Sequence, residues 1–315
     1  MEDRIFSPKS LQKRPTGTGY FYVALAALLW AASGSTAKFL FREGILPLQL
    51  VQLRTTIALT SLFAWLLIRD RTLLKIAPKD LLYFPLTGIA LAVTQGAYLY
   101  SISKIQVAAA ILLQYQSPVL IAAYAYLFTR KRPSFTSIVA ITGALAGCYL
   151  MVGGYSLDMV NMNASGIAAG LVSAVAFAAY TVISEQGMKV YRPWTVLFYA
   201  LVFAAVFWNT FQPPLSAFSR TYSSACWLGV LFVSTFGMVI PYGLYNKGIS
   251  VIQATNASIT ATLEPVIAGI IAYLFLGEFM HFWQLAGGML VISSIVFLQT
   301  RQGHRNPHKD IPNSP

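Results

Sequence analysis

Apolar residues along this chain gather into ten long runs, each separated from the next by a short polar segment. The runs cover roughly residues 20–41, 47–67, 81–101, 105–127, 135–153, 165–186, 193–211, 226–247, 252–275 and 281–299. Each run is close to the ~20 residues that a helix needs to cross a bilayer. The pattern therefore predicts an all-α polytopic membrane protein with ten transmembrane helices.

The ninth run has a twin in the fourth. A shift of 147 positions places residues 252–278 on residues 105–131 without a gap. The identical pairs include Tyr98 with Tyr245, Gln106 with Gln253, and Pro118 with Pro265. An internal repeat of this size indicates two copies of one structural unit. We expect one five-helix repeat over 19–153, a linker over 154–164 and a second repeat over 165–300.

The number of helices in each copy determines how the copies are oriented. Five is an odd number, so the second repeat enters the membrane upside down relative to the first. Inverted repeats of this kind are typical of secondary transporters, which bind their substrate near the midplane between the repeats.

The first apolar run has an alternative interpretation. It follows a basic start and contains Ala31, Ala32 and Ser33, which could mark a cleaved signal peptide. The same shift, however, places Ala31 and Ala32 on Ala178 and Ala179. We therefore expect this run to be part of the fold. Polar, basic tails are expected over 1–18, where we predict disorder, and over 301–315.

The composition agrees with a lipid environment. The chain is 57% hydrophobic and 10% charged, whereas a soluble domain carries about 25% charged residues. The net charge of +12 could suggest nucleic acid, but the basic residues lie in tails and short loops. Cys148 and Cys226 lie in or beside apolar runs, which favours packing over a disulfide or a metal site. No zinc spacing, Walker-type phosphate loop or nucleophile elbow occurs in the sequence.

The positions of Lys and Arg predict the orientation. Most of them lie in the two tails and in alternate loops, and the opposite loops hold only Arg42, Lys104 and Arg220. Because cytoplasmic loops carry the excess of basic residues, both termini are expected in the cytoplasm. The 154–164 and 212–225 loops are then expected outside the cell inner membrane.

Two segments resemble a known family. They are LEPVIAGIIAYLFLGE in the ninth run and QYQSPVLIAAYAYLF in the fourth, together with the arginine of LVQLRTTIAL, Arg54. They resemble the drug/metabolite transporter superfamily, EamA type, over residues of about 20–300. The resemblance implies ten helices around a central cavity and movement of small metabolites, often amino acids and usually outward. The first repeat departs from the pattern, because Arg130 and Lys131 stand where the second has Gly277 and Glu278.

Glu264 lies near the middle of the ninth run. A carboxylate at bilayer depth costs about 3 kcal/mol or more, so it is expected to face a cavity or a partner. Asn256 and Thr260 precede it at helical spacing and predict a polar face along one cavity wall. Glu264 could bind an ammonium group or a proton there. The alternative is a structural acid paired with a neighbouring helix.

Two cations also lie within predicted helices. Arg54 is about seven residues into its helix, roughly 10 Å deep, and needs an anion, carbonyl groups or water. It could pair with Glu264 or receive a substrate carboxylate. Lys38 lies nearer a helix end, where it could bind substrate or extend to the interface. Glu185 and Lys189 are one turn apart and predict a surface ion pair.

Pro118 and Pro265 each remove a backbone donor. The carbonyl groups of Gln114 and Ala261, four residues earlier, lose their helical partners, so both helices are expected to kink. Carbonyl groups freed in this way line wet cavities or are buried in protein. The two prolines are therefore either a matched pair of conformational hinges or static kinks.

Rings and glycines within the runs add two further expectations. Trp30, Tyr98 and Tyr245 are candidates for the apolar wall of the cavity, against the alternative of plain packing. Two G-x-x-x-G patterns, Gly143 with Gly147 and Gly166 with Gly170, predict close helix contacts. Those contacts could lie within a monomer or in a homodimer.

Together these features favour a secondary transporter that moves a small amphipathic metabolite by alternating access. Amino-acid export is the leading hypothesis, with uptake or exchange of a vitamin or nucleoside as the alternative. The expected partners are the substrate, a coupled proton and membrane lipid, with no cofactor, metal or nucleic acid. An intramembrane enzyme or receptor is disfavoured, because His281, His304 and His308 lie at a helix end or in the tail. Receptors also rarely have inverted repeats.

Overall fold

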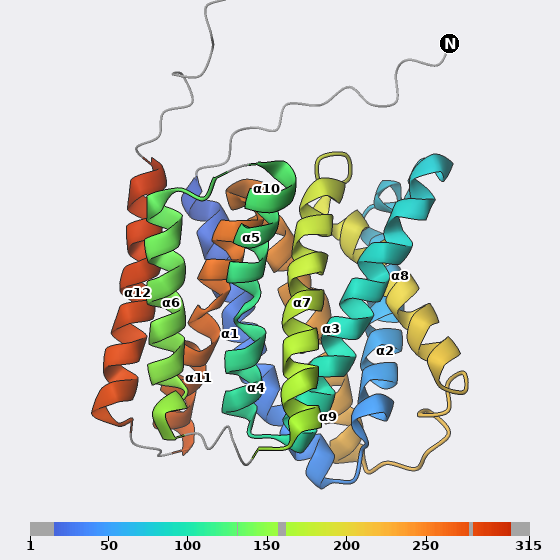
Figure 1. Ribbon diagram of the computed structural model, residues 1–315. Coiled ribbons are helices and arrows are strands. Elements are labelled where there is room, and N and C mark those ends of the chain that lie inside the picture. The colour runs from blue at the N-terminus through green and yellow to red at the C-terminus, as the bar shows by residue number, and fades with distance from the viewer. Residues whose placement is uncertain (1–15, 131, 157–161, 277–279, 304–315) are drawn as a thin grey trace, which may run out of the picture.

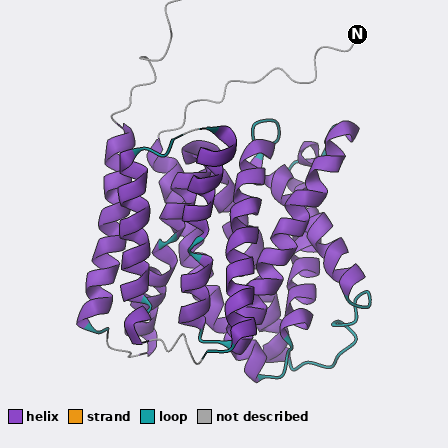
Figure 2. Cartoon of the chain, viewed as in Figure 1, coloured by secondary structure: helices purple, strands orange, loops and turns teal. Residues whose placement is uncertain are grey.

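The computed structural model describes residues 16–130, 132–156, 162–276 and 280–303. In these ranges all regular elements are helical (Figure 2). The helices form one bundle with their axes roughly aligned (Figure 1). We call the side at which α1 begins and α12 ends the upper side, as it is drawn in Figure 1, and the opposite side the lower side.

The α-helices and their bounds are, in chain order, α1 (Thr16–Arg42), α2 (Pro47–Arg69), α3 (Phe84–Lys104), α4 (Val107–Gln114), α5 (Ser117–Thr129), α6 (Phe135–Met151), α7 (Ala164–Gly187), α8 (Pro193–Phe211), α9 (Ser224–Ser234), α10 (Ile240–Ala261), α11 (Leu263–Leu276) and α12 (Phe282–Gly303). Four short helical turns accompany them: η1 (Arg71–Leu74), η2 (Pro78–Tyr83), η3 (Gly154–Ser156) and the π-helical η4 (Thr235–Val239).

Local sequence explains where many of these helices begin. The side chains of Ser134, Asn163 and Ser223 each accept a backbone N–H of the first turn that follows. Capping of this kind satisfies donors that have no partner inside the helix. A proline lies in the first turn of α2, α3, α5 and α8. Proline is tolerated at that position because its missing N–H would be unbonded there.

The predicted ten crossings are confirmed within the described residues. Eight segments are long and apolar enough to span a membrane, and α6 is a shorter apolar helix. The remaining crossing begins inside α10. Gln253 has φ 69° and ψ 164°, so the chain turns there, and 254–261 continues into α11. α10 therefore joins the end of the eighth crossing to the start of the ninth.

Two crossings are interrupted near their middle, as the prolines predict. α4 ends at Gln114 and α5 begins at Ser117, directly before Pro118. In the second half α10 ends at Ala261 and α11 begins at Leu263, two residues before Pro265. Proline cannot donate to the carbonyl four residues earlier, so a continuous helix is disfavoured at both places.

Equivalent positions of the two halves meet at the centre of the bundle. Gln95 donates to the hydroxyl of Tyr242, which lies 147 positions later. The rings of Trp30 and Phe177, separated by the same interval, are T-shaped with centroids 6.1 Å apart. α1 begins at the upper side and α7 at the lower side (Figure 1). The halves are therefore inverted copies related by an axis through the centre, and we call equivalent positions repeat mates.

The small residues pack inside the chain. A Cβ added to Gly147 would lie 2.7 Å from the carbonyl oxygen of Gly287 in α12, and Gly143 lies against Ser294 of the same helix. Gly166 and Gly170 in turn lie against α3 and α4. Both G-x-x-x-G patterns thus serve contacts within one chain, and a homodimer stays a prediction. The two cysteines are buried and not bonded to each other.

Several predicted segments lie wholly or partly outside the described residues. These are the two tails (1–18 and 301–315), the linker (154–164), and the positions Lys131, Gly277 and Glu278.

Candidate functional site

A cavity lies in the middle of the bundle. Five of the residues expected at a substrate site line it: Trp30, Arg54, Tyr98, Gln114 and Glu264. The empty space of the cavity measures about 590 Å³ when its solvent-open part is included, and the centre of a water molecule can reach about 50 Å³. That smaller volume holds a few water molecules. A metabolite therefore needs the walls to move apart.

Arg54 reaches the cavity from α2 and is only 6% exposed. Its Nη2 donates to the carbonyl oxygen of Gly237 in η4 over 3.1 Å. Pro241, four residues after Gly237, has no N–H to give to that carbonyl, so the guanidinium supplies a donor. The Nε of Arg54 is buried and has no hydrogen-bond partner. A buried N–H of a cation without an acceptor costs free energy. The Nε of Arg54 is therefore a candidate site for an anion.

Glu264 reaches the cavity from the first turn of α11. The hydroxyl of Tyr115 donates to its Oε2 over 2.7 Å. The positive end of the helix dipole also favours a carboxylate in a first turn. Among the described residues, Arg54 and Glu264 form no ion pair within 4 Å, so the direct pairing considered from the sequence is absent in this conformation. The carboxylate retains capacity for further donors.

Rings close the cavity on one face. The Trp30 ring lies 5.2 Å from that of Tyr242 and 5.4 Å from that of Tyr245, measured between centroids. Phe177 stacks on Tyr245 at 5.4 Å. Trp30, Phe177 and Tyr242 line the cavity. Tyr245 does not line it, because it is fully buried behind Trp30 and its hydroxyl lies 3.2 Å from that of Thr181.

Three further predicted site residues lie away from the cavity. Asn256 donates its side-chain amide to the carbonyl of Ile252, and the hydroxyl of Thr260 donates to the carbonyl of Asn256. Such bonds to the preceding turn satisfy polar groups of a buried helix without a ligand. Lys38 is exposed on α1. Substrate binding by these residues and by Tyr245 stays a prediction.

Comparison with known proteins identifies the architecture. The model of the EamA-like transporter family matches residues 17–153 and again 164–300. The chain belongs to the EamA-like transporter family. It is a multi-pass membrane transporter, and this is a family of transporters, not of enzymes. The family that the sequence resembles is therefore confirmed.

Two curated transporters and one solved structure are similar to this EamA-like transporter. An uncharacterized transporter of Archaeoglobus fulgidus is 28% identical over 72% of this chain and 76% of its own. The uncharacterized inner membrane transporter YicL of Salmonella typhimurium is 26% identical over 90% of this chain and 95% of its own. A crystal structure with 18% identity aligns with a TM-score of 0.72 over 91% of this chain and 99% of its own, which shows the fold alone.

Some cavity residues of the EamA-like transporter were not expected at a site. They are Gln95 and Gly237, and both line the cavity. Two signals in the sequence point to them. Gln95 is the repeat mate of Tyr242, so a contact near the axis is expected from symmetry. Pro241 marks the carbonyl of Gly237 as one that needs an external donor.

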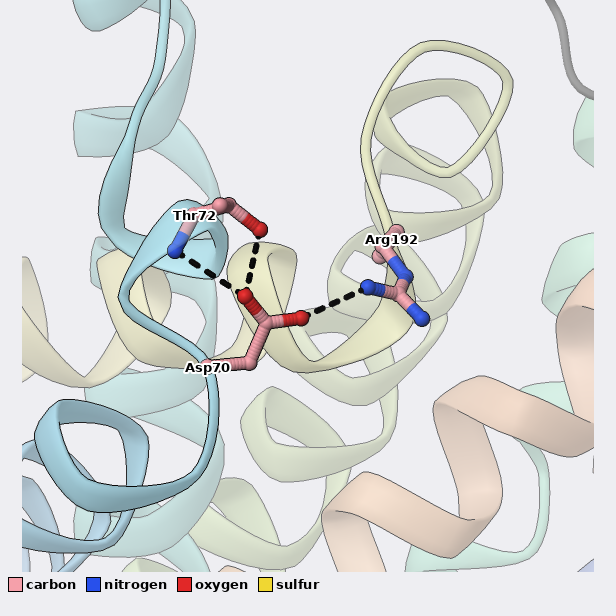
Figure 3. Close-up of polar contacts among 3 residues, drawn as sticks. All are labelled: Asp70, Thr72 and Arg192. Carbon is pink, nitrogen blue, oxygen red and sulfur yellow. Dashed lines mark hydrogen bonds and ion pairs between the residues drawn. The ribbon is translucent and has the colours of Figure 1, made fainter.

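Polar contacts at the upper side join the two halves of the transporter. Figure 3 shows the hydrogen bonds that the carboxylate of Asp70 accepts. The donors are the backbone N–H of Thr72 at 3.1 Å, the hydroxyl of Thr72 at 2.5 Å and the guanidinium of Arg192 at 3.0 Å. The hydroxyl of Thr72, then its backbone N–H, and then the guanidinium of Arg192 lower the pKa of the Asp70 carboxyl. The hydroxyl of Tyr191 donates to Asp80 at 2.5 Å. The loops after α2 and α7 are thereby tied together.

Proposed function

We propose that this EamA-like transporter exports small zwitterionic metabolites, foremost amino acids, across the cell inner membrane by alternating access. The observation that carries the proposal is one cavity with both charge types on its wall. Arg54 offers an unbonded donor, and Glu264 retains acceptor capacity. Rings form the apolar part of the same wall.

The two charges match the two ends of an amino acid. An unpaired ion in a low-dielectric site is strongly unfavourable, so both ends of a buried zwitterion must be satisfied. The planar guanidinium of Arg54 suits a carboxylate, to which it can donate more than one hydrogen bond. The ammonium group would then lie at Glu264, beside the Tyr115 hydroxyl. Trp30 and Tyr98 would take the side chain. A proton at Glu264 would replace the ammonium group when the site is empty.

The orientation is part of the proposal. The excess of Lys and Arg in the tails and in the loops at the upper side supports a cytoplasmic location for that side. One relative carries the name of an inner membrane transporter. With this orientation, export begins with an amino acid entering from the upper side and ends with its release at the lower side. Pro118 and Pro265 are the proposed hinges.

Calorimetry on the purified chain tests the binding site. Three ligands are compared: an amino acid, its amide, which lacks the carboxylate, and its deaminated analogue, which lacks the ammonium group. Wild type should bind the amino acid at least about tenfold more tightly than either analogue, since a lost charged hydrogen bond is worth about 1.5–3 kcal/mol. Glu264→Gln should remove the preference over the deaminated analogue. Arg54→Lys should weaken binding of the amino acid although the charge remains.

Lys104→Gln is the matched control, because it removes an exposed cation at the end of α3 that does not line the cavity. It should leave affinity unchanged. Proteoliposomes loaded with labelled amino acid then test movement across the bilayer. If Glu264→Gln retains wild-type discrimination, or if only uncharged solutes bind, the zwitterion site is wrong.

A further inference from the structure

The carboxylate of Glu185 does not form the surface ion pair expected with Lys189. Its Oε1 accepts the backbone N–H of Ala254 over 3.1 Å. Lys189 donates instead to the side chain of Gln186. The two residues are spaced for a pair on one helix. The carboxylate instead accepts the N–H of Ala254, which lies at the start of the ninth crossing and has no acceptor within its own helix. The first N–H groups of a helix have no partner there, and a carboxylate suits both the donor and the helix dipole.

The turn that presents this N–H is strained. Gln253 has φ 69° and ψ 164°, a backbone conformation that residues with a side chain rarely adopt. Its repeat mate Gln106 has φ −63° and ψ 141°, which is ordinary extended backbone. The same turn of the repeat therefore exists in two conformations in one molecule. Such strain persists only where the surroundings hold it in place.

The repeat mate of Glu185 is Lys38. A lysine cannot accept an N–H, and the positive end of a helix dipole disfavours a cation. Lys38 is exposed, and it lies in the last turns of α1, which ends at the lower side (Figure 1). The carboxylate contact is thus possible at the upper side and impossible at the lower side.

The residues around Glu185 are tightly packed, whereas their repeat mates near Lys38 line the cavity. Beside Glu185, the hydroxyl of Tyr180 donates to Asn246 at 3.1 Å, and both side chains are buried. Thr181 and Tyr245 are in contact in the same layer. The repeat mates of Tyr180, Thr181 and Asn246 are Ser33, Gly34 and Leu99, and all three line the cavity. The interface of α7 with α10 is closed where the interface of α1 with α3 holds the cavity.

We infer that Glu185 is the latch of the upper gate: it holds the start of the ninth crossing against α7 and keeps the transporter in the conformation seen here. This inference rests on the proposed alternating access but not on the substrate. Inverted repeats change state by exchanging the conformations of their halves. Opening the upper side would break the contact of Glu185 with Ala254 and allow Gln253 to relax toward the conformation of Gln106. Closure of the lower side gains no equivalent contact, because Lys38 stands there.

The test measures accessibility and needs no substrate. Two reporter cysteines are placed, one at a time, in a chain whose Cys148 and Cys226 have been changed to serine. Ser184→Cys reports on the upper gate, where the native side chain is fully buried. Ala37→Cys, at its repeat mate, reports on the cavity that it lines. Full-length protein in vesicles of either orientation is treated with a membrane-impermeant maleimide, and the labelling rate is measured.

Each latch variant has a stated direction. Glu185→Ala should raise the labelling rate at Ser184→Cys by about tenfold and lower the rate at Ala37→Cys, since a charge-assisted hydrogen bond is lost. Glu185→Gln should have a smaller effect of the same sign, because its amide oxygen is a weaker acceptor. Lys189→Ala is the matched control and should change neither rate. Gln253→Gly should shift both rates in the opposite direction, because glycine accepts the positive φ without strain.

Two results would overturn the latch. The first is a change in labelling by Lys189→Ala as large as that by Glu185→Ala. The effect of Glu185 would then come from its interaction with Lys189 on α7 and not from its contact with Ala254. Alternatively, Gln253→Gly could shift the two reporters reciprocally while both Glu185 variants match wild type. In that case alternating access stands and the latch does not. If the calorimetric test of the substrate fails while the reporters respond to Glu185, the zwitterion is wrong and the latch stands.

Discussion

The interface of α1 with α3 and that of α7 with α10 are the same interface in two copies of one repeat, and they are in different states. At the first, Ser33, Gly34 and Leu99 line a cavity. At the second, larger or more polar mates fill the space, with Tyr180 bonded to Asn246. A few side chains at equivalent positions therefore decide which side of a symmetric backbone is closed.

The difference shows what symmetry does and does not provide in an inverted-repeat transporter. Under the proposed alternating access, the shared backbone supplies two conformations of nearly equal architecture, because each half can take the shape of the other. The side chains then set the balance between them. Where small residues face each other the helices separate, and where rings and hydrogen bonds meet they stay together. Changes that exchange side chains between the two interfaces should move that balance.

The largest effect is expected from Ser33→Tyr, which gives the open interface the residue of the closed one. Ser33 lies on the cavity wall, and Gly237 approaches it closely from η4. A phenol there would occupy the space that the substrate needs and would press against Gly237, so transport and binding should fall by at least about tenfold. Transport into proteoliposomes measures the loss, with Ser33→Ala as a control that should retain most activity. Wild-type transport by Ser33→Tyr would show that the cavity is not on the path.

The next largest effect is expected from Asn246→Leu, the reverse exchange. The variant removes the Asn246 acceptor of the Tyr180 hydroxyl, and the loss of a buried hydrogen bond costs about 1–3 kcal/mol. The upper gate should then open more often, and the protein should be less stable to thermal unfolding in detergent. Tyr180→Phe removes the same bond from the other end. The double variant should be little worse than either single variant, because the two changes delete one interaction. Fully additive effects would mean that the bond does not hold the gate.

A moderate effect is expected from the two prolines, which lie in equivalent crossings of the two halves. Pro118→Ala and Pro265→Ala allow the interrupted helices to become continuous, since alanine supplies the missing N–H. Transport should slow by a few fold while substrate affinity is unchanged, because the crossings flex less easily but the cavity residues remain. Stopped-flow transport and calorimetry separate the two quantities. Wild-type rates in both variants would leave only static kinks, and a large effect in one alone would show that the halves move unequally.

The fold could be predicted from the sequence because hydropathy and repetition record it directly. The length of the apolar runs predicts the crossings, and pairs such as Pro118 with Pro265 reveal the repeat. The odd number of helices in each repeat then predicts the inversion. Arg54 and Glu264 were identifiable because a charge at bilayer depth needs a special environment. The sequence does not predict which side of a helix faces the cavity. Asn256 and Thr260 have the spacing of a cavity wall, yet they bond to their own helix. The partner of Glu185 lies 69 positions away, on a turn whose strain no propensity predicts.

The smallest effect is expected at Asp70, which joins the halves at the upper surface and not in the gate. Its pKa lies below the usual value, first because of the hydroxyl and the backbone N–H of Thr72 and then because of Arg192. A carboxyl group with a lowered pKa in the folded state contributes stability above its unfolded pKa of about 3.9, and this contribution is lost as pH falls through the lower, folded value. Asp70→Asn should therefore lower the thermal midpoint slightly at pH 7, and the difference should shrink as pH falls below about 3.9 and vanish below the folded pKa. High salt should shrink the difference at pH 7 because the pair is exposed. Thermal unfolding of both proteins over this pH range measures it. A loss as large as that of Asn246→Leu would mean that the surface loops, and not the buried layer, hold the upper side closed.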